Sequence, residues 1–290
     1  MIEDCITKQT KIFEIQVDKL IEFNETDIKR FSFLAENISR ETGVPQNLIY
    51  TPPYFFFLDR WHKIHDLWYF YKSDDYDFHF INELLGEVIS EYFGLDTVHY
   101  HVASLCVKDE SIRYGLVSKN FCTPNYQYKR SWDYGFSPRK DLDILKEVQR
   151  ICHSEKEYLL LVEDLKKFFI RDFYTSQLDR SGNNFLFQQT TSGIRLAPLY
   201  DYENSFETSY VDVYRNQIAE INLQNPETLM ILKKDSKFQE LLHLLMQSDM
   251  SSFLNEVEER HQIRIPSEYK TDYRSHTSEV KKLIVEKKLL

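Results

Sequence analysis

Three oxygen-bearing residues, Asp179, Asn184 and Asp201, stand close enough in the chain to form one site for a metal-bound phosphate. Carboxylate and amide oxygens are the hard ligands that Mg²⁺ prefers, and Mg²⁺ commonly bridges the phosphates of a nucleotide. A carboxylate beside such a metal can also accept the proton of a substrate hydroxyl. The residue types therefore indicate phosphoryl transfer, provided that the fold brings them together.

A β-hairpin would bring two of these residues together. Residues 185–188 and 194–199 are rich in β-forming side chains, and the polar loop between them contains a glycine. In the simplest register Asn184 faces Pro198, and Asp201 follows a few residues later. Because the start of one strand lies beside the end of the next in a hairpin, the amide and the carboxylate converge at one end.

Asp179 precedes the first run across a loop that contains Gly182, so its carboxylate can reach a hydroxyl beside the metal. The same letters, DRSGNN, are also typical of an ordinary turn. Asp, Ser, Gly and Asn favour turns because they make local hydrogen bonds and tolerate positive φ. Taken alone, this short segment favours the turn.

With its flanks, the segment resembles the catalytic region of the HipA-like kinases of bacteria. That region has an Asp, an Asn five residues later, a hairpin and an L-x-P-x-Y/F-D ending. The corresponding residues here are Asp179, Asn184 and the LAPLYD that ends at Asp201, and the preceding VEDLKKFFIRDFYTSQ resembles the family's helix before the catalytic loop. The resemblance implies that Asp179 is the catalytic base and that Asn184 and Asp201 bind Mg²⁺.

A second segment resembles the small lobe of the same family. The aromatic run WYFYKSDD contains Lys72, and INELLGEVISEYFGLDTVHYHVA follows it as the expected helix and next strand. In kinases a strand lysine holds the ATP phosphates and pairs with a helix glutamate. The resemblance implies that Lys72 is this lysine and Glu83 this glutamate. Glu87, one turn later on the same helix face, is the alternative to Glu83. The strand pattern at 114–121 then resembles the strand before a hinge, which we place at 120–125.

The chain departs from ordinary protein kinases in three places. Its 7 glycines form neither G-x-G-x-x-G nor G-x-x-x-x-G-K-[ST], so no glycine-rich phosphate cradle is predicted. Residues 51–72, with backbone amides at 60–66, are the candidate cover. L-D-R stands at 178–180 where H-R-D is usual, and Tyr-Glu follows Asp201 instead of Phe-Gly. HipA-like kinases share the last two features, but a degenerate, inactive kinase stays an alternative.

These segments predict an α+β, two-lobed protein-kinase-like fold with a β-rich small lobe and a mainly helical large lobe. We expect an appended N-terminal segment of short helices at 1–50. A small nucleotide-binding lobe should occupy 51–121, and a large catalytic lobe 122–290.

Helix patterns follow from periodicity and end signals. The expected helices cover 26–41, 141–152 and 155–177, with several more after residue 225. Ser251 is the expected cap of one of these later helices, and Pro266 is expected to start the next.

Composition narrows the class of protein. With 42% hydrophobic and 15% aromatic residues, the chain is too rich in core-forming side chains to be disordered. Its apolar runs are far shorter than the roughly 20 residues of a membrane helix. The N-terminus lacks a basic region followed by an apolar one, so we expect no signal peptide and a cytoplasmic product without a membrane contact.

The net charge of −10 disfavours direct binding to nucleic acid. The four cysteines lack C-x-x-C spacing, which argues against a zinc ribbon or a disulfide framework. Two histidine pairs, His62 with His65 and His99 with His101, have metal-like spacings without a third ligand. A strand pair or a surface helix explains them more simply than zinc.

The sequence therefore predicts an ATP- and Mg²⁺-dependent phosphotransferase. The resemblance implies that the acceptor is a Ser or Thr hydroxyl of a protein, and that an antitoxin-like DNA-binding partner restrains the enzyme. Two alternatives stay open: a kinase acting on a small alcohol, and a non-catalytic kinase-like binding module. Retention of all three polar residues argues against the module, because converging carboxylates repel one another without a cation.

Overall fold

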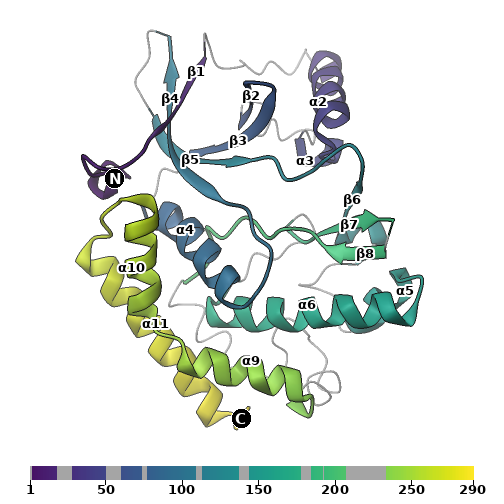
Figure 1. The fold of residues 1–290 in the computed structure, drawn as a ribbon, viewed down its shortest axis with the longest axis vertical. Coiled ribbons are helices and arrows are strands. Elements are labelled where there is room, and N and C mark those ends of the chain that lie inside the picture. The colour runs from purple at the N-terminus through teal and green to yellow at the C-terminus, as the bar shows by residue number, and fades with distance from the viewer. Residues whose placement is uncertain are drawn as a thin grey trace.

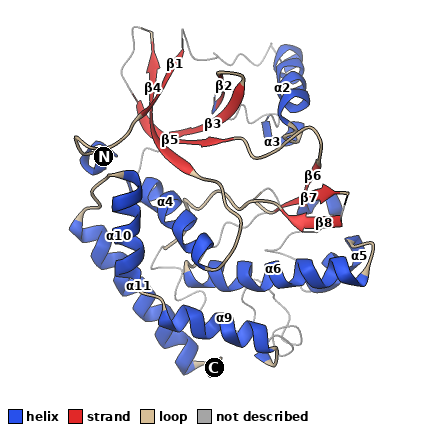
Figure 2. Cartoon of the chain, in the orientation of Figure 1, coloured by secondary structure: helices blue, strands red, loops and turns tan. Residues whose placement is uncertain are grey.

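The computed structural model describes nine stretches of the chain, residues 2–17, 28–49, 60–73, 77–108, 113–136, 144–177, 184–191, 193–206 and 233–290. Within them the protein is a mixture of helices and strands (Figure 1; Figure 2). A five-stranded sheet lies at one end of the molecule and most of the helices at the other, with a smaller three-stranded sheet beside them.

The five-stranded sheet has the order β1-β4-β5-β3-β2. Neighbouring strands are antiparallel except for β1, which pairs with β4 in parallel. Its members are β1 (Phe13–Val17), β2 (Trp61–Ile64), β3 (Leu67–Ser73), β4 (Tyr100–Val107) and β5 (Arg113–Lys119). Lys72, near the end of β3, pairs with Leu116 of β5, two residues beyond Phe70, where the pairing of β3 with β2 ends.

Strands β2 and β3 form a hairpin with a two-residue turn. Ile64 pairs with Leu67, and the turn residues His65 and Asp66 have φ angles of 47° and 64°. Two consecutive residues with positive φ are typical of the type I′ turn, which matches the twist of a hairpin but usually contains glycine. The hairpin belongs to the segment 51–72 that we named as the candidate phosphate cover. Residues 50–59 lie outside the described part of the chain.

Helix α4 (Asp77–Tyr92) lies between the five-stranded sheet and the helices α6 (Glu155–Tyr174) and α10 (Met250–His261) (Figure 1). It is surrounded on most sides, because residues 80–90 are all buried. Phe80, Ile81, Leu84 and Leu85 are fully buried in the main core. A helix buried in this way should be apolar all round, so its buried Asn82, Glu83, Glu87 and Ser90 need partners.

A connector at 120–126 runs from β5 to the three-stranded sheet, whose order is β6-β7-β8. These strands are β6 (Gln127–Arg130), β7 (Leu186–Thr190) and β8 (Gly193–Leu196). The β7–β8 hairpin predicted from the sequence is confirmed, but its register differs by one residue, because Ile194 pairs with Gln189.

Two N-terminal helices, α2 (Ile28–Thr42) and α3 (Gln46–Ile49), pack against this connector. Ala35 and Ile49 share an apolar cluster with Cys122 of the connector, and the Asn120 side-chain amide donates to the Thr42 carbonyl over 3.0 Å. These helices therefore contact the segment where we placed the hinge. The parallel pairing of β1 with β4 was not among the expected elements.

The helical part continues with α5 (Ile144–Ile151) and α6, then α9 (Ser236–Gln247), α10 and α11 (Ser267–Glu286). The expectation for Ser251 is wrong: α10 begins at Met250, and the Asp249 side chain accepts from the Ser251 backbone N–H over 3.0 Å. Pro266 directly precedes α11, as expected. Among the described residues, no helix is long and apolar enough to cross a bilayer.

His276 of α11 provides a test of core packing. Its side chain is fully buried, 5.4 Å from the Phe206 ring between centroids, and burial lowers its pKa to about 4. The unfolded chain takes up a proton at this residue below pH about 6.5, whereas the folded chain resists until about 4. The free energy of unfolding should therefore fall as the pH drops below about 6.5, by about 3 kcal/mol for this residue once the pH reaches 4.

We expect His276→Leu to flatten the pH dependence of stability. Urea unfolding of the wild type and the variant between about pH 7 and pH 4.5 measures the difference. His243→Gln, on the exposed face of α9, is the matched control. Equal slopes for wild type and His276→Leu would contradict the assignment.

Candidate functional site

Lys72 is the centre of a cluster of three carboxylates. Its Nζ lies 2.5 Å from Glu83 Oε1, 2.7 Å from Asp201 Oδ1 and 2.7 Å from Glu203 Oε2. An ammonium group has three N–H donors, so each carboxylate can take one. The Lys72 side chain is only 9% exposed and that of Glu83 is fully buried, whereas Asp201 and Glu203 keep 24% and 29% exposure and so reach solvent.

The charges of the cluster do not balance. Burial alone would lower the pKa of Lys72, but Asp201, Glu83 and Glu203 outweigh it and hold the pKa well above its ordinary value. Lys72 therefore stays positive at neutral pH. With the three carboxylates ionised, one positive charge faces three negative ones, and the site carries a net charge of −2. Such a site attracts a cation.

Glu83 fixes the backbone that carries the other two carboxylates. Its Oε1 accepts from the backbone N–H of Tyr202 over 2.9 Å and from that of Glu203 over 3.1 Å, in addition to Lys72. A buried carboxylate needs several hydrogen bonds to offset its desolvation, and Glu83 finds them in the segment that follows β8. The same oxygen thus joins the lysine strand to residues 202 and 203.

Two buried amide side chains hold the neighbouring carbonyls. Asn82 Nδ2 donates to the carbonyls of Glu203 and Ser205 over 2.7 and 2.8 Å. Gln177, just after α6, donates from Nε2 to the Asp201 carbonyl over 2.9 Å. The backbone of residues 201–205 is therefore held by one side chain of α4 and one that follows α6, and none of these bonds uses the side chains of 201–205.

Tyr202 anchors this segment in the core. Its ring is fully buried against the Arg171 guanidinium, 4.1 Å from the ring centroid, and its hydroxyl lies 2.6 Å from Thr97 Oγ1. In contrast to Tyr202, the neighbouring Asp201 side chain is 24% exposed, and Asp201 has a φ of 62°. Left-handed backbone at a residue other than glycine is uncommon, and strained backbone of this kind clusters at functional sites, where the surroundings enforce it.

The predicted site residues are placed as follows. Lys72, Glu83 and Asp201 are in contact. Asn184 is 91% buried at the start of the β7–β8 hairpin, where pairing continues through the bond from the Ala197 N–H to the Leu186 carbonyl. It thus lies at the hairpin end from which the chain runs on to Asp201. Asp179 belongs to residues 178–183, outside the described part of the chain.

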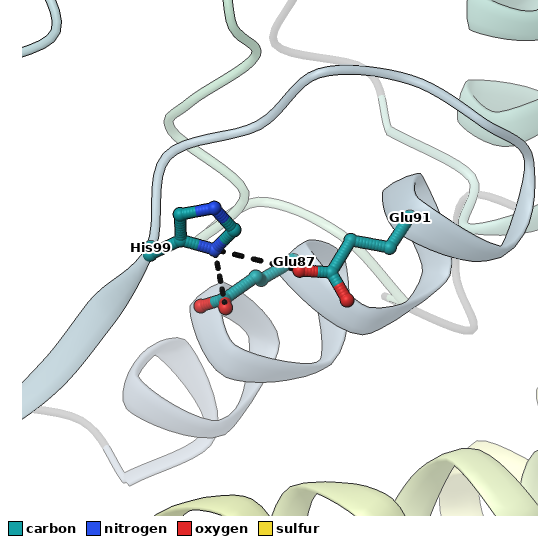
Figure 3. A group of neighbouring side chains, drawn as sticks. All are labelled: Glu87, Glu91 and His99. Atoms are coloured by element: carbon teal, nitrogen blue, oxygen red, sulfur yellow. Dashed lines mark hydrogen bonds and ion pairs between the residues drawn. The ribbon is translucent and has the colours of Figure 1, made fainter.

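Glu87, the alternative partner of Lys72, belongs to a different cluster. Its Oε1 lies 3.0 Å from Arg260 Nη1, and its Oε2 accepts from the Tyr100 N–H. The same Oε1 lies 3.1 Å from His99 Nδ1, as Figure 3 shows. Glu91, one turn later, also pairs with Arg260, over 2.7 Å. Glu87, Glu91 and His99 have spacings suited to a metal, and the Arg260 guanidinium, which also pairs with Glu256, already contacts both carboxylates. We interpret this cluster as an ion-pair network that joins α4 and β4 to α10.

Glu203 is the member of the site that the sequence analysis did not assign. The Tyr-Glu pair after Asp201 was recognised only as a departure from Phe-Gly. The available signal in the sequence was a second carboxylate two residues after Asp201.

The fold is kinase-like, as comparison with solved structures shows. A crystal structure of the Helicobacter pylori proinflammatory kinase CtkA matches with a TM-score of 0.56 over 78% of this chain and 90% of that one, at 14% identity. The kinase-like fold predicted from the sequence is confirmed. A HipA from Shewanella oneidensis, in a complex with HipB and operator DNA, also matches, with a TM-score of 0.49, 12% identity and coverage of 87% and 70%. No family model and no curated protein matches the sequence.

Gly86 provides a test of the packing beneath the site. A Cβ at this position of α4 would lie 2.3 Å from Cγ of the buried Tyr202 ring. We expect Gly86→Ala to displace Tyr202 and to lower the free energy of unfolding by about 1–3 kcal/mol, although alanine favours helices. Thermal unfolding compared with Lys156→Ala, at an exposed position of α6, measures the cost. A Gly86→Ala protein as stable as wild type would show that the ring is free to move.

Removing Lys72 should leave three carboxylates whose oxygens lie within 4.8 Å of one another without their cation. We expect Lys72→Ala to lower the melting temperature in EDTA, and Mg²⁺ to restore it more than it stabilises the wild type, because a divalent cation relieves the repulsion. Lys63→Ala, which removes an exposed lysine paired with Glu41, is the control. An equal Mg²⁺ response in the two variants would contradict the electrostatic description.

Proposed function

We propose that this chain is an ATP- and Mg²⁺-dependent phosphotransferase, a HipA-like kinase that phosphorylates Ser or Thr of a protein. The observation that carries the proposal is the contact of a buried strand lysine with a helix glutamate and with the aspartate that follows the hairpin, on a kinase-like fold. Kinases place these groups around the phosphates of ATP in this order of elements.

The donors at the site suit Mg²⁺. Asp201 would contribute a carboxylate oxygen and Asn184 an amide oxygen, and a net charge of −2 around Lys72 favours a divalent cation. Bound Mg²⁺ would neutralise charge on the transferred phosphate. Lys72 would hold phosphate oxygens, and Glu83 would orient Lys72 while fixing the backbone at 202 and 203.

Asp179 is the proposed general base. Chain geometry limits its Cα to roughly 7 Å from that of Gln177. Gln177 in turn holds the Asp201 carbonyl, so the loop with Asp179 begins at the site. A carboxylate in this position would accept the proton of the attacking hydroxyl.

The two lobes are part of the proposal. The small lobe at 51–121 would contain β2–β5 and α4, and the large lobe at 122–290 the hairpin and the remaining helices. Residues 120–125 of the connector would be the hinge that binds adenine. The N-terminal 50 residues would then support this arrangement, since β1 extends the sheet and α2 and α3 pack on the connector.

A protein acceptor, a cytoplasmic location and an antitoxin-like DNA-binding partner are proposed from the sequence resemblance. The net charge of −10 is consistent with a partner that makes the DNA contacts.

Transfer of label from ATP tests the function. Incubating the purified chain with γ-labelled ATP, Mg²⁺ and a lysate should label Ser or Thr of specific proteins. Asp201→Asn and Asn184→Ala should abolish or severely lower this transfer, because both disturb cation placement. Asp179→Asn should lower it by about 10² to 10⁴ while sparing ATP binding. Asp272→Asn, on the exposed surface of α11, is the matched control.

Other outcomes separate the alternatives. Label confined to metabolites would replace the protein kinase by a kinase of small alcohols. ATP binding without transfer under any metal condition would favour a kinase-like binding module. Equal activity of Asp179→Asn and wild type would remove Asp179 from the catalytic role.

A further inference from the structure

Glu203 has no part in the proposed transfer, yet it takes one of the three donors of Lys72. We infer that Glu203 makes nucleotide binding conditional on a divalent cation, by competing with the phosphates for Lys72. The inference rests on the proposed function, because it concerns the same lysine and the same ligand.

Hydrogen-bond capacity is the first reason. Lys72 has three N–H donors, and three carboxylates lie within 2.7 Å of its Nζ. A phosphate oxygen can therefore accept a hydrogen bond from Lys72 only by displacing one of these carboxylates. Glu83 is the least replaceable, since it is fully buried and also accepts two backbone N–H groups.

Asp201 and Glu203 are the replaceable partners. Both reach solvent, with side chains 24% and 29% exposed, so both can turn toward another ligand without an uncompensated burial cost. Asp201 is the proposed cation ligand, and a cation there would withdraw it from Lys72. Without the cation Asp201 keeps its donor, so phosphate must displace a carboxylate, and Glu203 is the more exposed of the two.

Charge is the second reason. The phosphates of ATP are strongly negative, and the cluster they approach has a net charge of −2. Repulsion at a partly exposed site is reduced by solvent but not abolished. A divalent cation that arrives with the nucleotide cancels this charge and offers the carboxylates a new partner. Free ATP lacks that compensation, so Glu203 penalises it more than the metal complex.

The side chain of residue 203 can be changed without moving its backbone. The Glu203 N–H donates to Glu83, and its carbonyl accepts from Asn82 over 2.7 Å. Neither bond uses the Glu203 carboxylate. Glu203→Gln therefore removes one charge and keeps the size and the chain path. Glu203→Asp keeps the charge on a shorter side chain.

The experiment measures binding of a non-hydrolysable ATP analogue, the β,γ-imido compound, by calorimetry in EDTA and in Mg²⁺. We expect Glu203→Gln to bind the analogue roughly three- to tenfold more tightly than wild type in EDTA, and within about twofold of wild type in Mg²⁺. Glu203→Asp should keep the wild-type ratio of the two dissociation constants. Glu240→Gln, which removes an exposed carboxylate paired with Lys237 on α9, should keep it as well.

Three results would overturn the inference. Equal affinities of wild type and Glu203→Gln in EDTA would show that Glu203 does not compete with phosphate. Weaker binding of Glu203→Gln in Mg²⁺ alone would make Glu203 a cation ligand instead. Absence of wild-type binding in either condition would reject the proposed function itself, and this result is distinct from the first two.

Discussion

The buried contact between Lys72 and Glu83 is the interaction on which the arrangement of the site depends. Taking a lysine and a glutamate out of water costs several kcal/mol for each charge, and their attraction offsets this only with good geometry and additional hydrogen bonds. The protein supplies them: Glu83 Oε1 also accepts two backbone N–H groups, and Lys72 meets two further carboxylates. Losing either partner would leave an uncompensated charge in the core, which typically costs about 3–5 kcal/mol.

Helix α4 also holds the rest of the segment that follows Asp201. Its residues Asn82, Glu83, Gly86 and Ser90 are spaced to share one face, and each contacts the segment at 202–205. The amide holds carbonyls, the carboxylate holds N–H groups, the glycine admits the Tyr202 ring, and Ser90 Oγ lies 3.2 Å from the Tyr202 hydroxyl. The face of α4 toward this segment therefore carries a polar stripe matched to one partner. This stripe explains why buried polar residues interrupt the hydrophobic pattern of α4.

The sequence predicted much of this arrangement, because local signals are strong where elements are regular. The helix at 155–177, the hairpin after Asn184 and the order of Lys72, Glu83 and Asp201 could all be inferred from patterns. Non-local pairings could not: nothing within residues 13–17 shows that they will pair in parallel with β4, more than 80 residues later. Ser251 failed as a cap because Asp249, an equally good cap, stands two residues earlier and starts the helix there.

Glu203 was missed for a different physical reason. A carboxylate is expected on the surface, and its partial exposure of 29% agrees with that expectation. Its importance arises only from the lysine that two other elements bring to it. One lysine shared by three carboxylates is a less favourable arrangement than one balanced pair, and the left-handed backbone at Asp201 adds strain at the same point. Regular structure on both sides holds the carboxylates and the backbone of Asp201 in this unfavourable arrangement. β3 and α4 lie on one side, and α6 with Gln177 on the other. A cation would relieve the excess negative charge that this rigid frame holds together. On the proposed function, the surplus carboxylates therefore serve cation binding and not the stability of the fold.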